Sequence, residues 1–386
     1  MRFKPESGAV PFITFFLMSS LLFSGPVVAQ ETVRVAVFQN IKTLKLQADG
    51  GLTVYRANGN RLFPKPVKEL SVASAQTGLL INRKPFSESA IRVESSRNDI
   101  RINGQSFGGG LDIANKRGLL QAVETLDLED YVRGVVPLEL NSKWHPEALK
   151  VQAVVARTYA LYQKKQNSVK DYDLVATTND QLYGGKGIED IRASEAVRAT
   201  HGQVLTYAGQ LVNSVYHSTS AGPTEDVREV WGTDLPYLHG VDCPFDVRSP
   251  WYQWGRAIDL VTLENNLRRN GFSIGIVATV TPYRFSQAGR VTRVRILHSE
   301  GELVLRGDEF RRILGYTALP STHFKIDEIR QQIHFTGMGS GHGVGLCQWG
   351  AKELAERGFS YERILTYYYP GTQVQNAAAL ASLKTR

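Results

Sequence analysis

The sequence of 386 residues predicts an α+β fold, in which a β-rich accessory region precedes a mixed domain. Short β-branched runs separated by Gly- and Asn-rich turns occupy residues 32–125. One alanine-rich helical pattern follows, and alternating strand patterns return after it. We therefore expect the accessory region at 30–115, a mixed domain at 116–375 with an Ala-rich buried helix and antiparallel strands, and a C-terminal tail at 376–386.

The N-terminal segment, residues 1–29, has the pattern of a secretory signal peptide. Arg2 and Lys4 precede an apolar run at 9–23, and the small residues after it allow cleavage behind Ala29. A retained membrane anchor is the alternative, although the run is slightly short for a spanning helix. We expect the rest of the chain to be exported to the periplasm or cell wall, with membrane contact only if this segment is retained.

The net charge, the cysteine content and the absence of certain motifs argue against several classes of protein. The net charge of +8 is modest and the basic residues are scattered, which argues against nucleic acid as a partner. Two cysteines, Cys243 and Cys347, are too few for a disulfide framework. They could form one disulfide, remain free thiols, or join His217 and His342 around a metal. The chain lacks H-E-x-x-H, paired C-x-x-C and G-x-S-x-G motifs, which counts against a zinc peptidase and a serine hydrolase.

The clearest helix is predicted at 145–165, where Pro146 suits the first helical turn and four alanines favour the helix. Apolar residues nearly encircle it, which indicates a buried helix. Hairpins are expected to turn at 208–209 and at 300–301, the second leading into a short helix. Two short helices should end the domain, with a break at Gly358.

Glu139, in the stretch "VVPLEL", is the strongest candidate for chemistry. Its neighbours are apolar, and the first basic residue after it is Lys143. Apolar surroundings raise the pKa of a carboxyl group, so that it stays protonated near neutrality and can donate a proton to a leaving oxygen. The alternative is a glutamate at a strand end that faces water.

Two cations on the predicted helix, Lys150 and Arg157, are seven residues apart and share one face. They could line a polar cavity. The alternative is an ordinary exposed stripe, because Glu147 lies three residues before Lys150 and can pair with it.

Two histidines lie in polar or flexible contexts. His217 ends a predicted strand and precedes the hydroxyl side chains of 218–220, which suits a sugar-binding loop or a polar turn. His342 stands between glycines in "GMGSGHGVGLCQWGAKEL", where no flanking side chain blocks a ligand. The alternative is a histidine in a tight turn whose ring nitrogens are hydrogen-bonded within the protein. The glycine spacing matches neither a dinucleotide fingerprint nor a Walker loop.

Four ordered motifs carry a family resemblance: "DLEDYVRGVVPLELNSKWHPEALKVQAVVARTYAL", "VYHSTSAGPTEDVREVWG", "PYLHGVDCP" and "GMGSGHGVGLCQWGAKELAERGFSYERILTYYYPGT". From Gly118 to Thr372 the chain resembles the stage II sporulation protein D/LytB family. The resemblance implies an exported lytic transglycosylase that cleaves peptidoglycan glycan strands, particularly peptide-free ones. The alternative within the family is a non-catalytic enhancer of a cell-wall amidase, which would then be the partner.

The family's catalytic glutamate lies in a P-x-E motif, which here ends at Glu139. The resemblance implies that Glu139 protonates the leaving oxygen and then takes the proton from the muramic acid C6 hydroxyl. That hydroxyl attacks C1 and gives a 1,6-anhydro product, so one carboxylate suffices where most glycosidases need two. The implied substrate-binding residues are Lys150, Arg157, His217, Ser218, Ser220, His342, Gln348 and Trp349.

The chain also departs from the family pattern. The family usually has serine in place of Cys347 and tyrosine in place of Trp349. Some members bind zinc through histidines and cysteines around the H-S-T-S stretch, but here that stretch offers His217 and no cysteine, so neither zinc nor another cofactor is carried over. The alternating glycines would form a wall of the saccharide groove, where main chain meets sugar.

Overall fold

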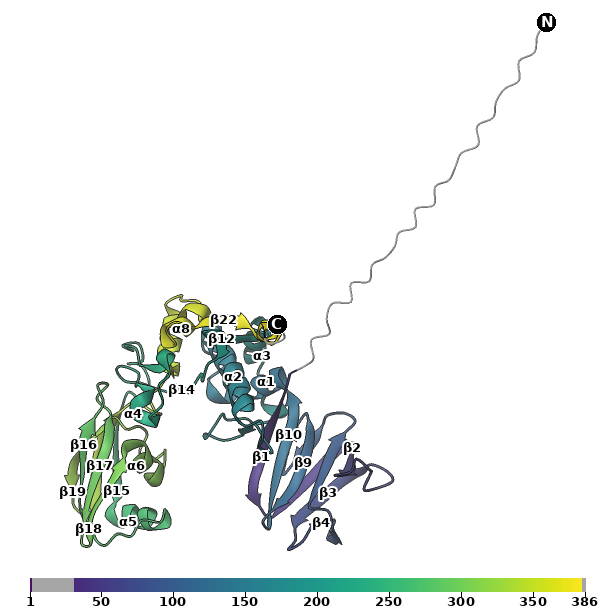
Figure 1. Cartoon of the computed structure of the whole chain (residues 1–386), viewed down its shortest axis with the longest axis horizontal. Helices are drawn as coiled ribbons and strands as arrows, with labels where there is room; N and C mark the ends of the chain where they lie inside the picture. Colours follow the sequence, from purple (N-terminus) through teal and green to yellow (C-terminus); the bar gives the residue numbers. More distant parts are fainter. Residues whose placement is uncertain (2–30, 384–386) are drawn as a thin grey trace. The chain divides into compact units, whose positions relative to one another are not determined.

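The computed structural model describes Met1 and residues 31–383 and confirms the α+β fold class (Figure 1). The predicted signal peptide lies outside the described residues, except for Met1. None of the described helices is long and apolar enough to cross a bilayer.

The N-terminal half of the chain is organised around an 11-stranded sheet. Its strands are β1 (Thr32–Ile41), β2 (Thr43–Arg56), β3 (Val67–Ser74), β4 (Leu79–Ile81), β5 (Lys84–Phe86), β6 (Ala90–Ser95), β7 (Ile100–Ile102), β8 (Gln105–Phe107), β9 (Gly110–Lys116), β10 (Leu119–Asp127) and β11 (Leu174–Val175). Strands β1, β10 and β9 are neighbours in the sheet and lie side by side in Figure 1. Alternate side chains such as Val33 and Val35 are buried, as the two-residue period of a strand requires.

This sheet does not end where the accessory region was expected to end. The expected boundary between residues 115 and 116 falls inside β9, and β11, from beyond the first two helices, pairs in parallel with β1. One hydrophobic core joins the sheet to these helices. Strands and helices on the two sides of residue 116 are therefore packed as one body.

The predicted helix is confirmed as α2 (Pro146–Gln166), and almost every side chain from Ala148 to Leu161 is buried. Helix α1 (Leu128–Glu139) differs from the expectation, because Glu139 ends a helix rather than a strand. The Asp127 side chain caps α1 by accepting from the backbone N–H groups of Glu129 and Asp130. The sequence did not predict this helix, because valines and a proline in its last turns disfavour helix formation.

The middle of the mixed region adds short elements around α2. They are η1 (Lys186–Ile188), α3 (Ile191–Ala199), β12 (Gln203–Tyr207), β13 (Gln210–Leu211), β14 (Tyr216–His217), α4 (Val227–Trp231) and η2 (Pro236–Leu238). The predicted hairpin is confirmed, since β12 pairs with β13 and turns at Ala208 and Gly209, both with positive φ.

A second hydrophobic core lies between β14 and its partner β21 (Leu346–Cys347) in the sequence. It is built from β15 (Gln253–Asp259), α5 (Leu260–Arg269), β16 (Val277–Phe285), β17 (Val291–His298), β18 (Gly301–Arg306), α6 (Gly307–Leu314), β19 (Phe324–Ile329) and β20 (Gln332–Met338). The hairpin of β17 and β18 followed by α6 is confirmed, although it turns at 299–300.

The chain ends with α7 (Gln348–Glu356), α8 (Tyr361–Tyr368), β22 (Gln373–Asn376) and α9 (Ala377–Leu383). The two predicted helices are therefore confirmed, and Gly358 between them has a φ of 86°. The expected tail at 376–386 begins with structure, because β22 pairs with β12 and α9 follows it.

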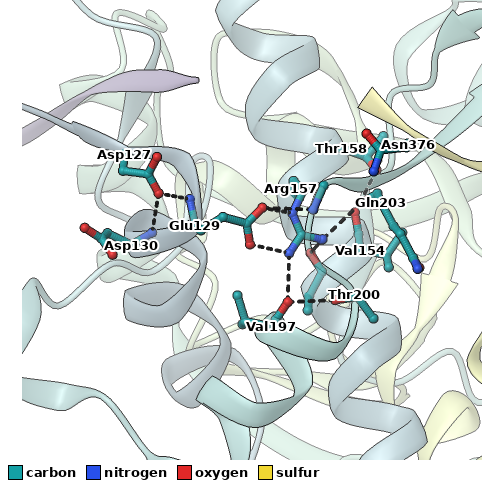
Figure 2. A network of polar contacts seen from close by, with 12 residues as sticks. Asp127, Glu129, Asp130, Val154, Arg157, Thr158, Val197, Thr200, Gln203 and Asn376 are labelled. Atoms are coloured by element: carbon teal, nitrogen blue, oxygen red, sulfur yellow. Dashed lines mark hydrogen bonds and ion pairs between the residues drawn. The ribbon is translucent and has the colours of Figure 1, made fainter. Parts of the chain in front are cut away.

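A buried ion pair joins α1 to α2 (Figure 2). The guanidinium of Arg157 donates to both carboxylate oxygens of Glu129 at 2.7 Å. It also donates to the carbonyl oxygens of Val197 in α3 and Gln203 in β12, at 3.3 and 3.0 Å. Arg157 is 0% exposed, so this network fixes four elements against one another.

We predict that Arg157→Met lowers the free energy of unfolding by about 3–5 kcal/mol, because Glu129 would remain buried without its partner. Lys150→Met is the matched control on the same helix. Its partly exposed pair with Glu147 should contribute no more than about 1 kcal/mol. Urea unfolding followed by circular dichroism measures both, and equal losses for the two variants would contradict a structural role for Arg157.

Candidate functional site

A cavity of about 780 Å³ lies beside the end of α1. Its walls come from α1, α2, β14, α4, β18, α6, α7 and the loops between them. Five of the residues expected from the sequence line it: Glu139, His217, Ser218, His342 and Gln348. These residues are up to about two hundred positions apart in the chain, so only the tertiary structure brings them together.

Glu139 is the last residue of α1 and is partly exposed to this cavity. One of its carboxylate oxygens accepts from the backbone N–H of Leu182 at 2.8 Å. Burial raises the pKa of Glu139, while hydrogen bonds from Leu182 and from the side chains of Tyr216 and Gln348 oppose that rise. The net direction is upward, which favours a protonated carboxyl group.

The two cavity histidines have opposite hydrogen-bonding roles. Nδ1 of His217 lies 3.1 Å from the carbonyl oxygen of Val344, which can only accept, so Nδ1 carries the proton. Nδ1 of His342 accepts from the backbone N–H of Val344 at 3.1 Å, so its proton is on Nε2. His217 Nε2 is thus a free acceptor, without a partner among the described residues, and His342 Nε2 is a donor.

Both imidazoles are held neutral. Burial, and then the neighbouring His342, lowers the pKa of His217 well below its usual value. Burial, and then the charge of Arg311, lowers the pKa of His342 to about 3. The rings lie 5.7 Å apart, centre to centre. The cavity lining therefore contains two neutral imidazole rings close together.

Two expected cations do not line this cavity. Arg157 is enclosed in its network with Glu129, which corrects the expectation that it faces a polar cavity. Lys150 pairs with Glu147 at 2.7 Å, which is the ordinary arrangement that the sequence allowed. Neither residue therefore lines this cavity.

Ser220 and Trp349 also lie outside the cavity lining. The Ser220 hydroxyl donates to the carbonyl oxygen of Pro223 and accepts from Arg290. The Trp349 ring packs edge-on against Trp144, with centres 5.2 Å apart. Neither residue is placed to meet a ligand in this cavity.

The glycine-rich loop serves packing more than ligand approach. At Gly341, with a φ of 111°, an added Cβ would lie 2.5 Å from the Cβ of His217. At Gly343, with a φ of 83°, it would lie 2.6 Å from Nε of Arg290. Gly341 does line the cavity, so the expected main-chain wall is limited to residues 340–342. The other glycines allow protein to pack against protein.

The sequence alone did not identify several residues of the cavity. Asp180, Asp308 and Glu309 are further carboxylates in the lining. The oxygens of Asp180 accept from the Tyr159 hydroxyl and the backbone N–H of Val175 at 2.8 and 2.7 Å. Arg311 and Trp231 also line the cavity. Nothing in the local pattern around Asp180 marks it, because its partners come from α2 and β11.

The two cysteines are buried free thiols. The potential metal ligand grouped with them is Asp246 rather than either cavity histidine. This corrects the alternative in which the two cysteines share a metal ion with His217 and His342.

Two family models match the chain. One described as Stage II sporulation protein matches residues 116–207, which contain α1, α2 and Glu139. The other, described as Domain of unknown function (DUF8618), matches residues 228–345 and encloses the second core.

The chain is also similar to whole proteins. An uncharacterised protein of Brachyspira hyodysenteriae is 32% identical over 307 residues, which cover 78% of this chain and 81% of that protein. Stage II sporulation protein D of Bacillus subtilis is 30% identical over 327 residues, with coverages of 78% and 92%. A Bacillus subtilis protein named amidase enhancer is 29% identical over 289 residues, which cover 62% of this chain and 40% of that protein. With similarity along most of both chains and a matching family model over α1 and α2, this chain belongs to the stage II sporulation protein D family.

Proposed function

We propose that this protein is an exported lytic transglycosylase that cleaves peptidoglycan glycan strands to 1,6-anhydro-muramyl products. The observation that carries the proposal is Glu139, a carboxyl group with a raised pKa that faces a large cavity. A protonated carboxyl group at that position can donate to a glycosidic oxygen and recover the proton from an attacking hydroxyl.

The size and chemistry of the cavity suit a saccharide. Its volume of about 780 Å³ is in the range of ligand pockets. His217 and His342 add neutral polar rings to the lining. Gln348 adds an amide close to Glu139, with its nitrogen 3.5 Å from the Glu139 carbonyl oxygen.

The mechanism uses Glu139 as the only catalytic carboxylate. Asp180 lies in the same cavity, but both of its oxygens are engaged by Tyr159 and the Val175 backbone. Asp308 and Glu309 also line the cavity and form ion pairs with Arg306 and Arg312. A carboxylate held in this way positions the cavity wall and is poorly suited to activating water. Attack by the sugar's own C6 hydroxyl removes the need for a second carboxylate.

The rival function is enhancement of a cell-wall amidase without glycan cleavage. It is favoured by similarity to the relative named amidase enhancer. Under this hypothesis the cavity binds glycan, and Glu139 contributes binding rather than proton transfer.

Incubation of the full chain with peptide-free glycan strands should release 1,6-anhydro-muramyl ends, detected by mass spectrometry. Attack by the C6 hydroxyl, with Glu139 as acid and then base, makes this product. Products with reducing ends would instead mean that water attacks, and this would contradict the proposed mechanism. Intact glycan together with faster turnover by an added amidase would favour the enhancer.

Glu139→Gln keeps the shape of the side chain and an oxygen that can accept from Leu182, but it cannot transfer protons. We expect turnover to fall by about 10²–10⁴-fold, while retention on the same glycan is preserved. The matched control is Glu124→Gln, because Glu124 is also a buried carboxyl group with a pKa raised by burial, and it lies outside the cavity lining. Near-normal turnover of the Glu139 variant would rule out the acid role.

The raised pKa of Glu139 sets the sign of two pH effects. Cleavage needs the protonated form, so it should persist above the ordinary glutamate pKa of about 4.3 and fall as pH rises through the raised value. The folded state holds this proton more tightly than the unfolded state. Wild type and Glu139→Gln should therefore differ least in stability at low pH, and the wild type should lose stability relative to the variant as pH rises. Paired urea titrations across pH test this, and a constant difference would contradict it.

A further inference from the structure

Three side chains with metal-binding atoms gather outside the cavity. Cys243 Sγ, a carboxylate oxygen of Asp246 and Cys347 Sγ lie within 4.8 Å of one another, and all three residues are buried. Asp246 Oδ2 is 3.2 Å from Cys347 Sγ. Zinc lies about 2.3 Å from sulfur and about 2.0–2.2 Å from oxygen ligands, so ligand atoms on one ion are within about 4 Å of each other. Small side-chain adjustments would let this cluster hold one ion.

Asp246 has one oxygen in use and one free. Oδ2 accepts from the backbone N–H groups of Ser220 and Ala221 at 2.7 and 2.8 Å. Oδ1 has no hydrogen-bond partner anywhere in the described part of the chain, although Asp246 is 0% exposed. A buried carboxylate oxygen without a partner is costly, and a bound cation would remove that cost.

Hydrogen-bond donors surround both sulfur atoms. The backbone N–H groups of Ser220 and Gly350 each donate to Cys347 Sγ at 3.4 Å. The Tyr368 hydroxyl oxygen is 3.2 Å from Cys243 Sγ. Such donors orient and stabilise a metal-bound thiolate. Burial, and then the hydrogen bond with Cys243, raises the pKa of the Cys347 thiol, so a cation must displace its proton on binding.

A buried arginine balances negative charge near the cluster. Arg290 is 3% exposed, and its guanidinium donates to the Ser220 carbonyl oxygen at 2.7 Å. Its charge interacts favourably with Cys347 and Asp246. Two thiolates and a carboxylate around a dication leave one net negative charge, which a neighbouring guanidinium stabilises.

We propose that Cys243, Asp246 and Cys347 bind a zinc ion that fixes the start of α7. Two thiolates select zinc over hard cations such as Mg²⁺ or Ca²⁺, and the fourth position is left to water. Cys347 caps α7 and precedes Gln348, so the ion would tie residues 243–246 to the helix that reaches Glu139. The site is separate from His217 and does not depend on glycan cleavage.

The test measures the metal itself. The full-length protein is expressed with added zinc and without a histidine tag. Elemental analysis by inductively coupled plasma mass spectrometry should then find roughly one zinc per chain. Cobalt-substituted protein should show thiolate-to-cobalt charge-transfer absorption. Loss of a residue that only hydrogen-bonds a metal ligand weakens metal binding by about 10- to 100-fold. Because Asp246 is proposed as a direct ligand, Asp246→Asn should weaken zinc binding by more than this. Competition with a chromogenic chelator measures the affinity.

The Asn variant is chosen to preserve the fold. Its oxygen can still accept from Ser220 and Ala221, while its NH₂ group occupies the position of the free oxygen. Asp242→Asn changes an exposed carboxylate in the same segment and should leave zinc affinity unchanged.

Three results would each overturn the proposal. The first is zinc-free protein after zinc supply, and the second is equal affinity in the two Asn variants. The third is a Cys243–Cys347 disulfide in non-reducing peptide maps of the native protein. If Asp246→Asn fails to fold, the cobalt spectrum of the unmodified chain decides, and a spectrum without charge-transfer absorption overturns the proposal.

Discussion

The buried ion pair between Glu129 and Arg157 is the constraint on which the candidate site depends. It joins α1 to α2 and, through carbonyl oxygens of α3 and β12, ties both helices to the rest of the core. Glu139 lies ten residues after Glu129 on the same helix, about 15 Å along its axis. Because a buried bidentate pair tolerates little displacement, the position of α1 and of its last residue is set by this contact.

Burial also controls the chemistry of the cavity. The same low-polarity surroundings raise the pKa of the Glu139 carboxyl group and lower the pKa values of His217 and His342. All three groups are thus biased toward their neutral forms. Of the three, the carboxyl group is the one whose neutral form carries an acidic proton, which suits the proton-transfer role proposed for it.

The second core extends the wall of this cavity. Arg311 belongs to α6 of that core and lies in the cavity lining, and its charge helps to keep His342 neutral. The chain enters this region after β14 and returns at β21, and these two strands pair directly. Cys347 of β21 is the backbone partner of His217, so the proposed metal cluster and the cavity each take one residue from this strand pair.

Local pattern was enough to predict much of this protein. Proline at 146 and the following alanines specify α2 because helix propensity and capping act over a few residues. Turn chemistry placed the hairpin at Ala208 and Gly209, and apolar neighbours singled out Glu139 before any fold was known. The strand pattern of the N-terminal region was visible from its alternation.

Tertiary structure decided the features that depend on distant partners. Arg157 looked like a cavity cation until Glu129, 28 residues earlier, proved to be its partner. Helix α1 forms despite its valines and Pro137, because an Asp127 cap and a buried face outweigh local preference. Asp180 enters the cavity through contacts with α2 and β11, and Gly341 is required by the nearby His217. These contacts join residues that lie tens to hundreds of positions apart in the chain. Local propensity acts over only a few residues, so these contacts are determined by tertiary packing.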